Sequence, residues 1–207
     1  MLFYNTIDAA TLALLKKLLL VPLFSGLRLA GGTSLALQSG HRKSIDLDLF
    51  GSLGADTITL SAALSHFEEV TRLNNSPNIH IYSINGIKVD IVNYPYPWID
   101  DLLLIDGIRL ASLKDIGAMK LAAITGRGTQ KDFVDLYLLL KHFSLPELIS
   151  FYEQKFKDGS VFLVLKSLVY FEDADAEQMP VMVMNFSWDQ VKVAIRKVHS
   201  EYMKSLG

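Results

Sequence analysis

The chain has 207 residues, half of them hydrophobic, with a formal net charge of −2 and no cysteine. This length and apolar content suffice for one domain, or for a small catalytic lobe with a helical appendage. The near balance of charges excludes a protein that binds nucleic acid through bulk positive charge, so any RNA partner would have to meet local patches. The lack of cysteine excludes disulfides and thiolate metal sites and favours a cytoplasmic protein.

The N-terminal segment predicts a helix followed by a short strand. Apolar residues recur at helical spacing over residues 8–20, and Pro22 ends the pattern. Lys16 and Lys17 interrupt the longest apolar run, so we expect no membrane-spanning segment. The first strand is then expected at residues 27–30.

A pair of glycines follows this strand and leads into a second predicted helix. We expect Thr33 or Ser34 to cap a helix over residues 35–38 that ends near Gly40. Glycines let backbone N–H groups approach an anion closely at a helix N-terminus. The sequence therefore predicts a phosphate cradle made of Gly31, Gly32, Thr33 and Ser34.

Two carboxylates, Asp46 and Asp48, stand at alternate positions of the next apolar run. In a strand they would share one face, while Ile45, Leu47 and Leu49 would point into the core. Two acids on one face repel each other unless a cation lies between them, so a divalent metal ion is expected here. The ordinary alternative for such a pair is a turn or a solvated strand edge.

A basic cluster, His41-Arg42-Lys43, precedes these acids. Arg42 either belongs to a solvated loop or helps to hold triphosphate charge, since a guanidinium grips phosphate oxygens in a fork.

The clearest hairpin signal lies further along the chain. After a helix expected over residues 56–70, two strand-like runs at 79–84 and 87–92 flank Asn85-Gly86, which suits a type I′ turn. The hairpin can bring Asp90 alongside the strand with the two acids. Asp90 is then either a further metal ligand or a structural strand residue.

From residue 107 the pattern becomes mainly helical. A last strand is expected at 108–110, and an irregular connector is expected at 172–180. Helices are expected to begin near four polar residues: Ser112, Thr129, Ser144 and Ser187. We therefore place a core with a mixed sheet at residues 1–110 and a helical C-terminal part at 111–207.

Three polar residues of the helical part have ordinary structural explanations. Asp115 and Asp132 stand at the third position of their helices, where a carboxylate caps the backbone and favours the helix dipole. Asp115 is assigned to capping alone. The ordinary explanation for Lys120 is a lysine at the protein surface.

Four separated motifs, in order, resemble the AbiEii/AbiGii-type toxin nucleotidyltransferases of bacterial toxin–antitoxin and abortive-infection systems, which share the DNA polymerase β-like superfold. The motifs lie at residues 30–37, 40–50, 115–124 and 127–136, and the likeness covers about residues 24–140. The resemblance implies an α+β nucleotidyltransferase fold with a small mixed β-sheet, followed by a helical C-terminal part.

The resemblance also implies an activity, the transfer of a nucleoside monophosphate from a nucleoside triphosphate to an RNA acceptor or, alternatively, a protein. It implies an antitoxin partner, and Mg²⁺ or alternatively Mn²⁺ as the cofactor. Lys120 and Asp132 would join Asp46 and Asp48 as catalytic residues. The nucleotide would be bound by Gly31, Gly32, Thr33, Ser34, Arg42 and Lys120, and the metal by Asp46, Asp48 and Asp90.

Two other functions remain open from the residues alone. A metal-dependent glycosyltransferase also uses Asp-x-Asp to hold a nucleotide, but it would not explain the glycine pair or the Lys120/Asp132 pair. A partner-binding module on the same fold, without catalysis, is disfavoured because every expected acid is present.

Overall fold

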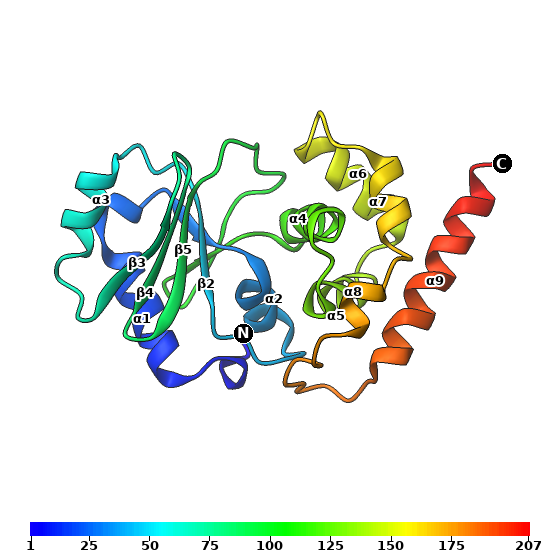
Figure 1. The fold of residues 1–207 in the computed structure, drawn as a ribbon, viewed down its shortest axis with the longest axis horizontal. Coiled ribbons are helices and arrows are strands. Elements are labelled where there is room, and N and C mark those ends of the chain that lie inside the picture. The colour runs from blue at the N-terminus through cyan, green and yellow to red at the C-terminus, as the bar shows by residue number, and fades with distance from the viewer. The chain divides into compact units, whose positions relative to one another are not determined.

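The computed structural model describes residues 1–207, except for the side chain of Asn75. The chain combines α and β structure and forms two compact units (Figure 1). Unit 1 comprises Met1–Tyr96 and Leu102–Ala111, and unit 2 comprises Pro97–Asp101 and Ser112–Gly207.

Unit 1 is built on a seven-stranded mixed sheet with the order β3-β4-β5-β2-β1-β7-β6 (Figure 1). The pairs β1–β7 and β2–β5 are parallel, and the other neighbouring strands are antiparallel. The sequence did not predict β6, a strand of three residues at the sheet edge. The strands are β1 Leu27–Leu29, β2 Leu47–Gly51, β3 Val70–Asn75, β4 Ile79–Ile84, β5 Ile87–Asn93, β6 Leu103–Ile105 and β7 Ile108–Leu110.

Three α-helices belong to unit 1: α1 Ala9–Leu20, α2 Gly31–Ser39 and α3 Thr57–Leu64. Asp8 caps α1 by accepting a hydrogen bond from the Thr11 N–H. Buried leucines of α1 pack with the apolar strand residues in one core, which removes this surface from water. The helix expected over residues 56–70 ends at Leu64, and the strand β3, which the sequence did not predict, begins at Val70.

The predicted hairpin is confirmed. Strands β4 and β5 pair in antiparallel register from Ile79–Val92 to Ile84–Ile87. Asn85 and Gly86 both have positive φ, +51° and +76°, as a type I′ turn requires. The right-handed twist of the strands selects this turn, and only residues such as Asn and Gly adopt it readily.

Unit 2 is helical. Ser112, Ser144 and Ser187 cap α4, α6 and α9 as predicted, each by accepting a backbone N–H with its side chain. The sequence did not predict α7, and α8 lies within the segment expected to be irregular. The helices are α4 Leu113–Gly126, α5 Gln130–Leu139, α6 Leu145–Lys155, α7 Val161–Ser167, α8 Glu172–Asp175 and α9 Trp188–Ser205.

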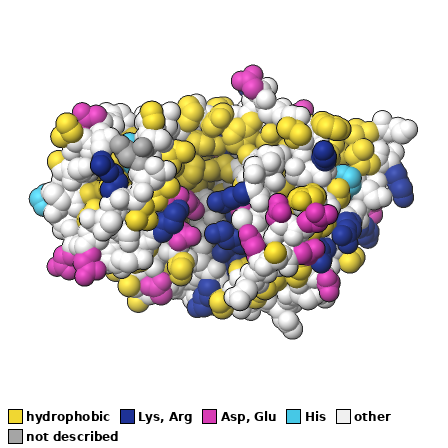
Figure 2. Space-filling view, in the orientation of Figure 1, with side chains coloured by type: hydrophobic (Ala, Val, Ile, Leu, Met, Phe, Trp, Pro, Cys, Tyr) yellow, Lys and Arg dark blue, Asp and Glu magenta, His cyan; other side chains and the backbone are white. Residues whose placement is uncertain are grey.

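The described residues contain no helix both long enough and apolar enough to cross a membrane. On the face drawn in Figure 2, Lys and Arg side chains form several separate groups with Asp and Glu side chains between them. This distribution agrees with the small net charge of the chain.

Candidate functional site

The glycine pair begins helix α2 directly. The helix starts at Gly31, and the residue before it, Ala30, provides no side-chain cap. The expectation that Thr33 or Ser34 caps this helix is therefore wrong. The reason is Gly31 itself: its φ of +63° lets the chain turn from β1 into the helix within one residue.

The Asp48 carboxylate lies against this helix start. A β-carbon added to Gly31 would stand 2.2 Å from Asp48 Oδ2, so a side chain here would collide with the carboxylate. The backbone carbonyl of Asp48 also accepts a hydrogen bond from the Ala30 N–H at 2.8 Å. The structure thus brings together two predicted elements, the glycine turn and one carboxylate.

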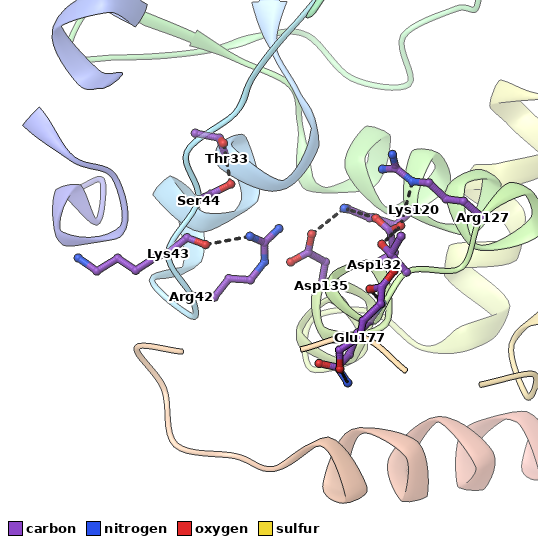
Figure 3. Close-up of polar contacts among 11 residues, drawn as sticks. Thr33, Arg42, Lys43, Ser44, Lys120, Arg127, Asp132, Asp135 and Glu177 are labelled. Atoms are coloured by element: carbon purple, nitrogen blue, oxygen red, sulfur yellow. Dashed lines mark hydrogen bonds and ion pairs between the residues drawn. The ribbon is translucent and has the colours of Figure 1, made fainter. Parts of the chain in front are cut away.

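Thr33 and Ser34 are buried inside α2. The Thr33 hydroxyl bonds to the Ser44 hydroxyl and to the Asp46 carbonyl oxygen, which holds the segment before β2 against the helix (Figure 3). The Ser34 hydroxyl accepts a hydrogen bond from the Gln38 amide at 3.1 Å.

The two acids have different backbone settings. Strand β2 begins at Leu47, so Asp48 lies in the strand and Asp46 precedes it; both are partly exposed. Leu47 and Leu49 are fully buried as predicted, but Ile45 is 65% exposed. The prediction for Ile45 is wrong because the regular strand alternation begins two residues later.

Asp90 lies beside Asp48, as the hairpin led us to expect. Strands β2 and β5 are parallel, and Asp48 pairs with Asp90 in their register. The Lys88 ammonium lies 2.6 and 2.7 Å from the two Asp90 oxygens. Lys88 and Asp90 share a strand face, so this ion pair holds the Asp90 carboxylate beside β2.

Arg42 is only 4% exposed, which excludes the solvated-loop alternative. Its guanidinium donates a hydrogen bond to the Lys43 carbonyl oxygen at 2.9 Å (Figure 3).

The carboxylates fit a metal ion that arrives with its substrate. Among the described residues, no three His, Asp or Glu side chains gather closely enough to hold an ion by themselves. Mg²⁺ is usually bound by one or two carboxylates together with substrate phosphates. Asp46 and Asp48, with Gly31 leaving room for the Asp48 oxygen, provide a donor set of this kind.

In unit 2, Lys120 is held between two buried carboxylates. Its ammonium nitrogen lies 2.9 Å from Asp132 Oδ1 and 2.6 Å from Asp135 Oδ2 (Figure 3). The Lys120 side chain is 7% exposed and both aspartate side chains are 0% exposed, which excludes a surface lysine. Asp135 was missed from the sequence, although its position three residues after Asp132 places both on one side of α5.

The second oxygen of Asp132 accepts hydrogen bonds from the Thr129 hydroxyl at 2.5 Å and from Arg127 Nε at 3.2 Å (Figure 3). Burial alone would raise the pKa of Asp132, but the Lys120 charge and these donors outweigh it and hold that pKa below its usual value. The capping partner at the start of α5 is instead Glu177, whose carboxylate accepts the Gln130 N–H at 2.7 Å.

Asp115 does not cap α4 as predicted, because the cap is the Ser112 hydroxyl, which accepts the Asp115 N–H at 3.1 Å. The Asp115 carboxylate forms a fully buried ion pair with Lys155 at 2.7 Å and accepts the Ile99 N–H at 2.9 Å. The Lys155 ammonium also donates to the Pro97 carbonyl oxygen and lies 4.4 Å from the centroid of the Trp98 ring. Asp115 and Lys155 thereby attach the segment Pro97–Asp101 to the helices of unit 2.

Comparison with known families identifies the chain. The model of the nucleotidyl transferase AbiEii toxins, from type IV toxin–antitoxin systems, matches residues 13–181. The chain belongs to this family. An uncharacterized protein of Aquifex aeolicus is 33% identical over 201 residues, which cover 92% of this chain and 95% of the relative. These matches confirm the predicted family of toxin nucleotidyltransferases.

Solved structures confirm the predicted fold class of this AbiEii family member. JHP933 from Helicobacter pylori superposes with a TM-score of 0.55 at 20% identity, over 96% of each chain. MenT4, a nucleotidyltransferase toxin from Mycobacterium tuberculosis, superposes with a TM-score of 0.56 at 16% identity, over 92% of this chain and 83% of the MenT4 chain. The antibiotic-resistance factor ANT(2'')-Ia superposes with a TM-score of 0.54 at 15% identity, over 69% of this chain and 89% of the ANT(2'')-Ia chain.

Proposed function

We propose that this AbiEii family member transfers a nucleoside monophosphate from a nucleoside triphosphate to an RNA acceptor in the cytoplasm, and that a cognate antitoxin restrains it. The observation that carries the proposal is the Asp48 carboxylate lying against the start of α2, with Asp90 beside it on the neighbouring parallel strand. A helix N-terminus favours phosphate and two acids favour a divalent cation, so this arrangement suits a metal-bound triphosphate.

Each residue of unit 1 has a separate role in this proposal. Asp46 and Asp48 would hold Mg²⁺, or alternatively Mn²⁺, with Asp90 as a further ligand. The ion, when bound, would neutralise phosphate charge and polarise the phosphoryl oxygens. The backbone N–H groups of Gly31 and Gly32, which begin α2, would donate to the terminal phosphates.

The Thr33 and Ser34 hydroxyls would support the shape of the cradle rather than bind phosphate themselves. Thr33 fixes the segment that leads to Asp46, and Ser34 is bonded within α2. The Ser34 N–H already donates to the Ala30 carbonyl oxygen at 3.3 Å, so we propose that the Thr33 N–H takes part in phosphate binding while the hydroxyls of both residues keep the cradle in shape. Arg42 would add a guanidinium to the binding of triphosphate charge.

The charged cluster of unit 2 would act in the same reaction. Lys120 would bind triphosphate charge, and Asp132 would orient or deprotonate the attacking hydroxyl. Asp135, which lies 2.6 Å from the Lys120 ammonium, would hold that ammonium in place beside Asp132. The Lys120 charge and the donors Thr129 and Arg127 hold the pKa of Asp132 below its usual value, so the carboxylate is ionised at neutral pH and would orient the attacking hydroxyl as a hydrogen-bond acceptor.

The proposal is tested by incubating the purified chain with each α-labelled nucleoside triphosphate, Mg²⁺ and total RNA. We expect one nucleotide to label a product that ribonuclease removes, and we expect both chelation and Asp46→Asn to abolish the labelling. Label on protein instead of RNA would move the acceptor to a protein. Transfer of sugar from a nucleotide-sugar would favour the glycosyltransferase alternative, and no transfer to any acceptor would favour the binding module.

A further inference from the structure

A cavity of about 560 Å³ lies in unit 1 between the end of α3 and the strands β3 and β4. Its walls combine apolar side chains with hydroxyls and one guanidinium; they are Ser61, Leu64, Ser65, Phe67, Val70, Arg72 and Tyr82. A volume between about 300 and 1,000 Å³ is typical of sites for small organic ligands.

The cavity is separate from the acidic residues of the candidate active site. Tyr82 pairs with Val89 across the β4–β5 ladder, so the two side chains share one face of the sheet. Asp90 follows Val89 in the same strand and points to the other face. The sheet therefore stands between this cavity and the carboxylates of Asp48 and Asp90, which pair on neighbouring strands.

Arg72 gives the cavity a positive charge. It is the charged member of the lining, and among the described residues no carboxylate forms an ion pair with it. Its field reaches the neighbouring strand: burial lowers the pKa of His80, and the Arg72 charge lowers it further. A guanidinium without a counter-ion at a cavity wall favours a carboxylate or phosphate ligand.

Tyr82 supplies a second polar group. The residue is 2% exposed, and its hydroxyl has no hydrogen-bond partner among the described residues. Buried hydroxyls in folded proteins nearly always have a partner. Tyr82 stands opposite Arg72 in the β3–β4 ladder, so both groups belong to one patch of the cavity wall.

We propose that this cavity binds a small organic oxyanion, with the carboxylate or phosphate on Arg72 and Tyr82 and the apolar body against Leu64, Phe67 and Val70. The larger groove beside it, about 780 Å³, has no such preference for one sign of charge. Both Lys17 and Glu68 line that groove, to which residues of α1 and also Phe67 contribute.

The test is a titration of the full chain with benzoate and with phenyl phosphate, followed by NMR at the amides of Ser61, Ser65 and Tyr82. Benzamide serves as the neutral probe of the same shape. We expect both anions to shift these amides in a saturable way and benzamide to have little effect. Arg72→Gln should weaken anion binding about tenfold or more, since it removes a charged hydrogen-bond donor.

Two further variants locate the binding. Tyr82→Phe should weaken it by a smaller factor without loss of folding, because it removes a hydroxyl that has no described partner. Lys17→Gln removes a positive charge from the larger groove and should leave anion affinity unchanged. The proposal is overturned if neither anion binds, if benzamide binds equally well, or if Arg72→Gln or Tyr82→Phe binds the anions as the natural chain does.

Discussion

The two units hold their charged residues in contrasting ways. In unit 1, Asp46 and Asp48 are partly exposed around the start of β2. In unit 2, Lys120 and its two aspartates are almost completely removed from water. Exposed carboxylates stay ready to bind a cation with the substrate, whereas buried ones must be neutralised by the fold itself. Removing the Asp46 or Asp48 charge should therefore change chemistry alone, whereas removing the Lys120 charge should change both chemistry and stability.

Lys120→Ala should give the largest effect. It removes the Lys120 ammonium from the buried carboxylates of Asp132 and Asp135, so the free energy of unfolding should fall by about 3–5 kcal/mol, and nucleotide transfer should be lost. Lys120→Arg should recover only part of the activity, because the guanidinium has a different shape. Urea denaturation and the transfer rate measure both effects.

Lys88→Ala is the matched control. It also removes a lysine from an ion pair, but Lys88 and Asp90 are 42% and 18% exposed, so the loss of stability should stay within about 1 kcal/mol. Equal losses in the two lysine variants would contradict the contrast between the units.

Asp48→Asn should show the opposite pattern. We expect the transfer rate to fall by about a thousandfold, because several kcal/mol of charge stabilisation disappear with the metal ligand. The melting temperature should stay the same or rise slightly, since repulsion between neighbouring carboxylates is relieved. A folded variant that transfers nucleotide at the natural rate would remove Asp48 from the site.

Acid should destabilise unit 2 through its buried aspartates. Burial alone would raise the pKa of Asp115 and of Asp132, but Lys155, Lys120 and their other donors hold both pKa values below the usual one. The stability they contribute is complete above the unfolded value of about 3.9 and is lost as the pH falls through the lower folded values.

The two tryptophans, Trp98 and Trp188, both belong to unit 2, so intrinsic fluorescence reports acid unfolding there. Asp115→Asn should flatten the dependence of stability on pH below about 4. An unchanged dependence in this variant would show that the buried pair with Lys155 does not produce the effect.

Asp90→Asn should have the smallest effect. The Lys88–Asp90 pair is partly exposed, so its loss should change the free energy of unfolding by less than about 1 kcal/mol. We expect the transfer rate to fall less than in Asp48→Asn, because Lys88 already neutralises Asp90. A fall as large as in Asp48→Asn would establish Asp90 as a full metal ligand.

Local signals in the sequence were sufficient for much of this fold. The Asn85-Gly86 turn and the serine caps at Ser112, Ser144 and Ser187 depend on residues close together in the chain, and all were predicted. The start of α2 was misplaced because threonine is a common capping residue, whereas the positive φ of Gly31 lets the chain enter the helix before Thr33.

Features that depend on distant contacts were harder to predict. Arginine and lysine usually lie at the protein surface, yet Arg42, Lys120 and Lys155 are buried. Their burial follows only from the packing of elements far apart in sequence. Asp115 was expected only to cap α4, but its carboxylate pairs with Lys155 and so joins two different helices. The short strand β6 has too few residues for a periodic pattern.

Nucleotidyl transfer places the α-phosphate of the nucleotide on the acceptor and releases the β- and γ-phosphates as pyrophosphate. Labelling each phosphate separately therefore distinguishes this reaction from other phosphate transfers. The natural chain is incubated with its preferred nucleoside triphosphate labelled at the α- or at the γ-phosphate, with Mg²⁺ and RNA, beside Asp48→Asn. We expect α-label in the RNA, γ-label released as pyrophosphate, and neither product with Asp48→Asn. Appearance of γ-label in the acceptor, or equal α-labelling by Asp48→Asn, would contradict this expectation.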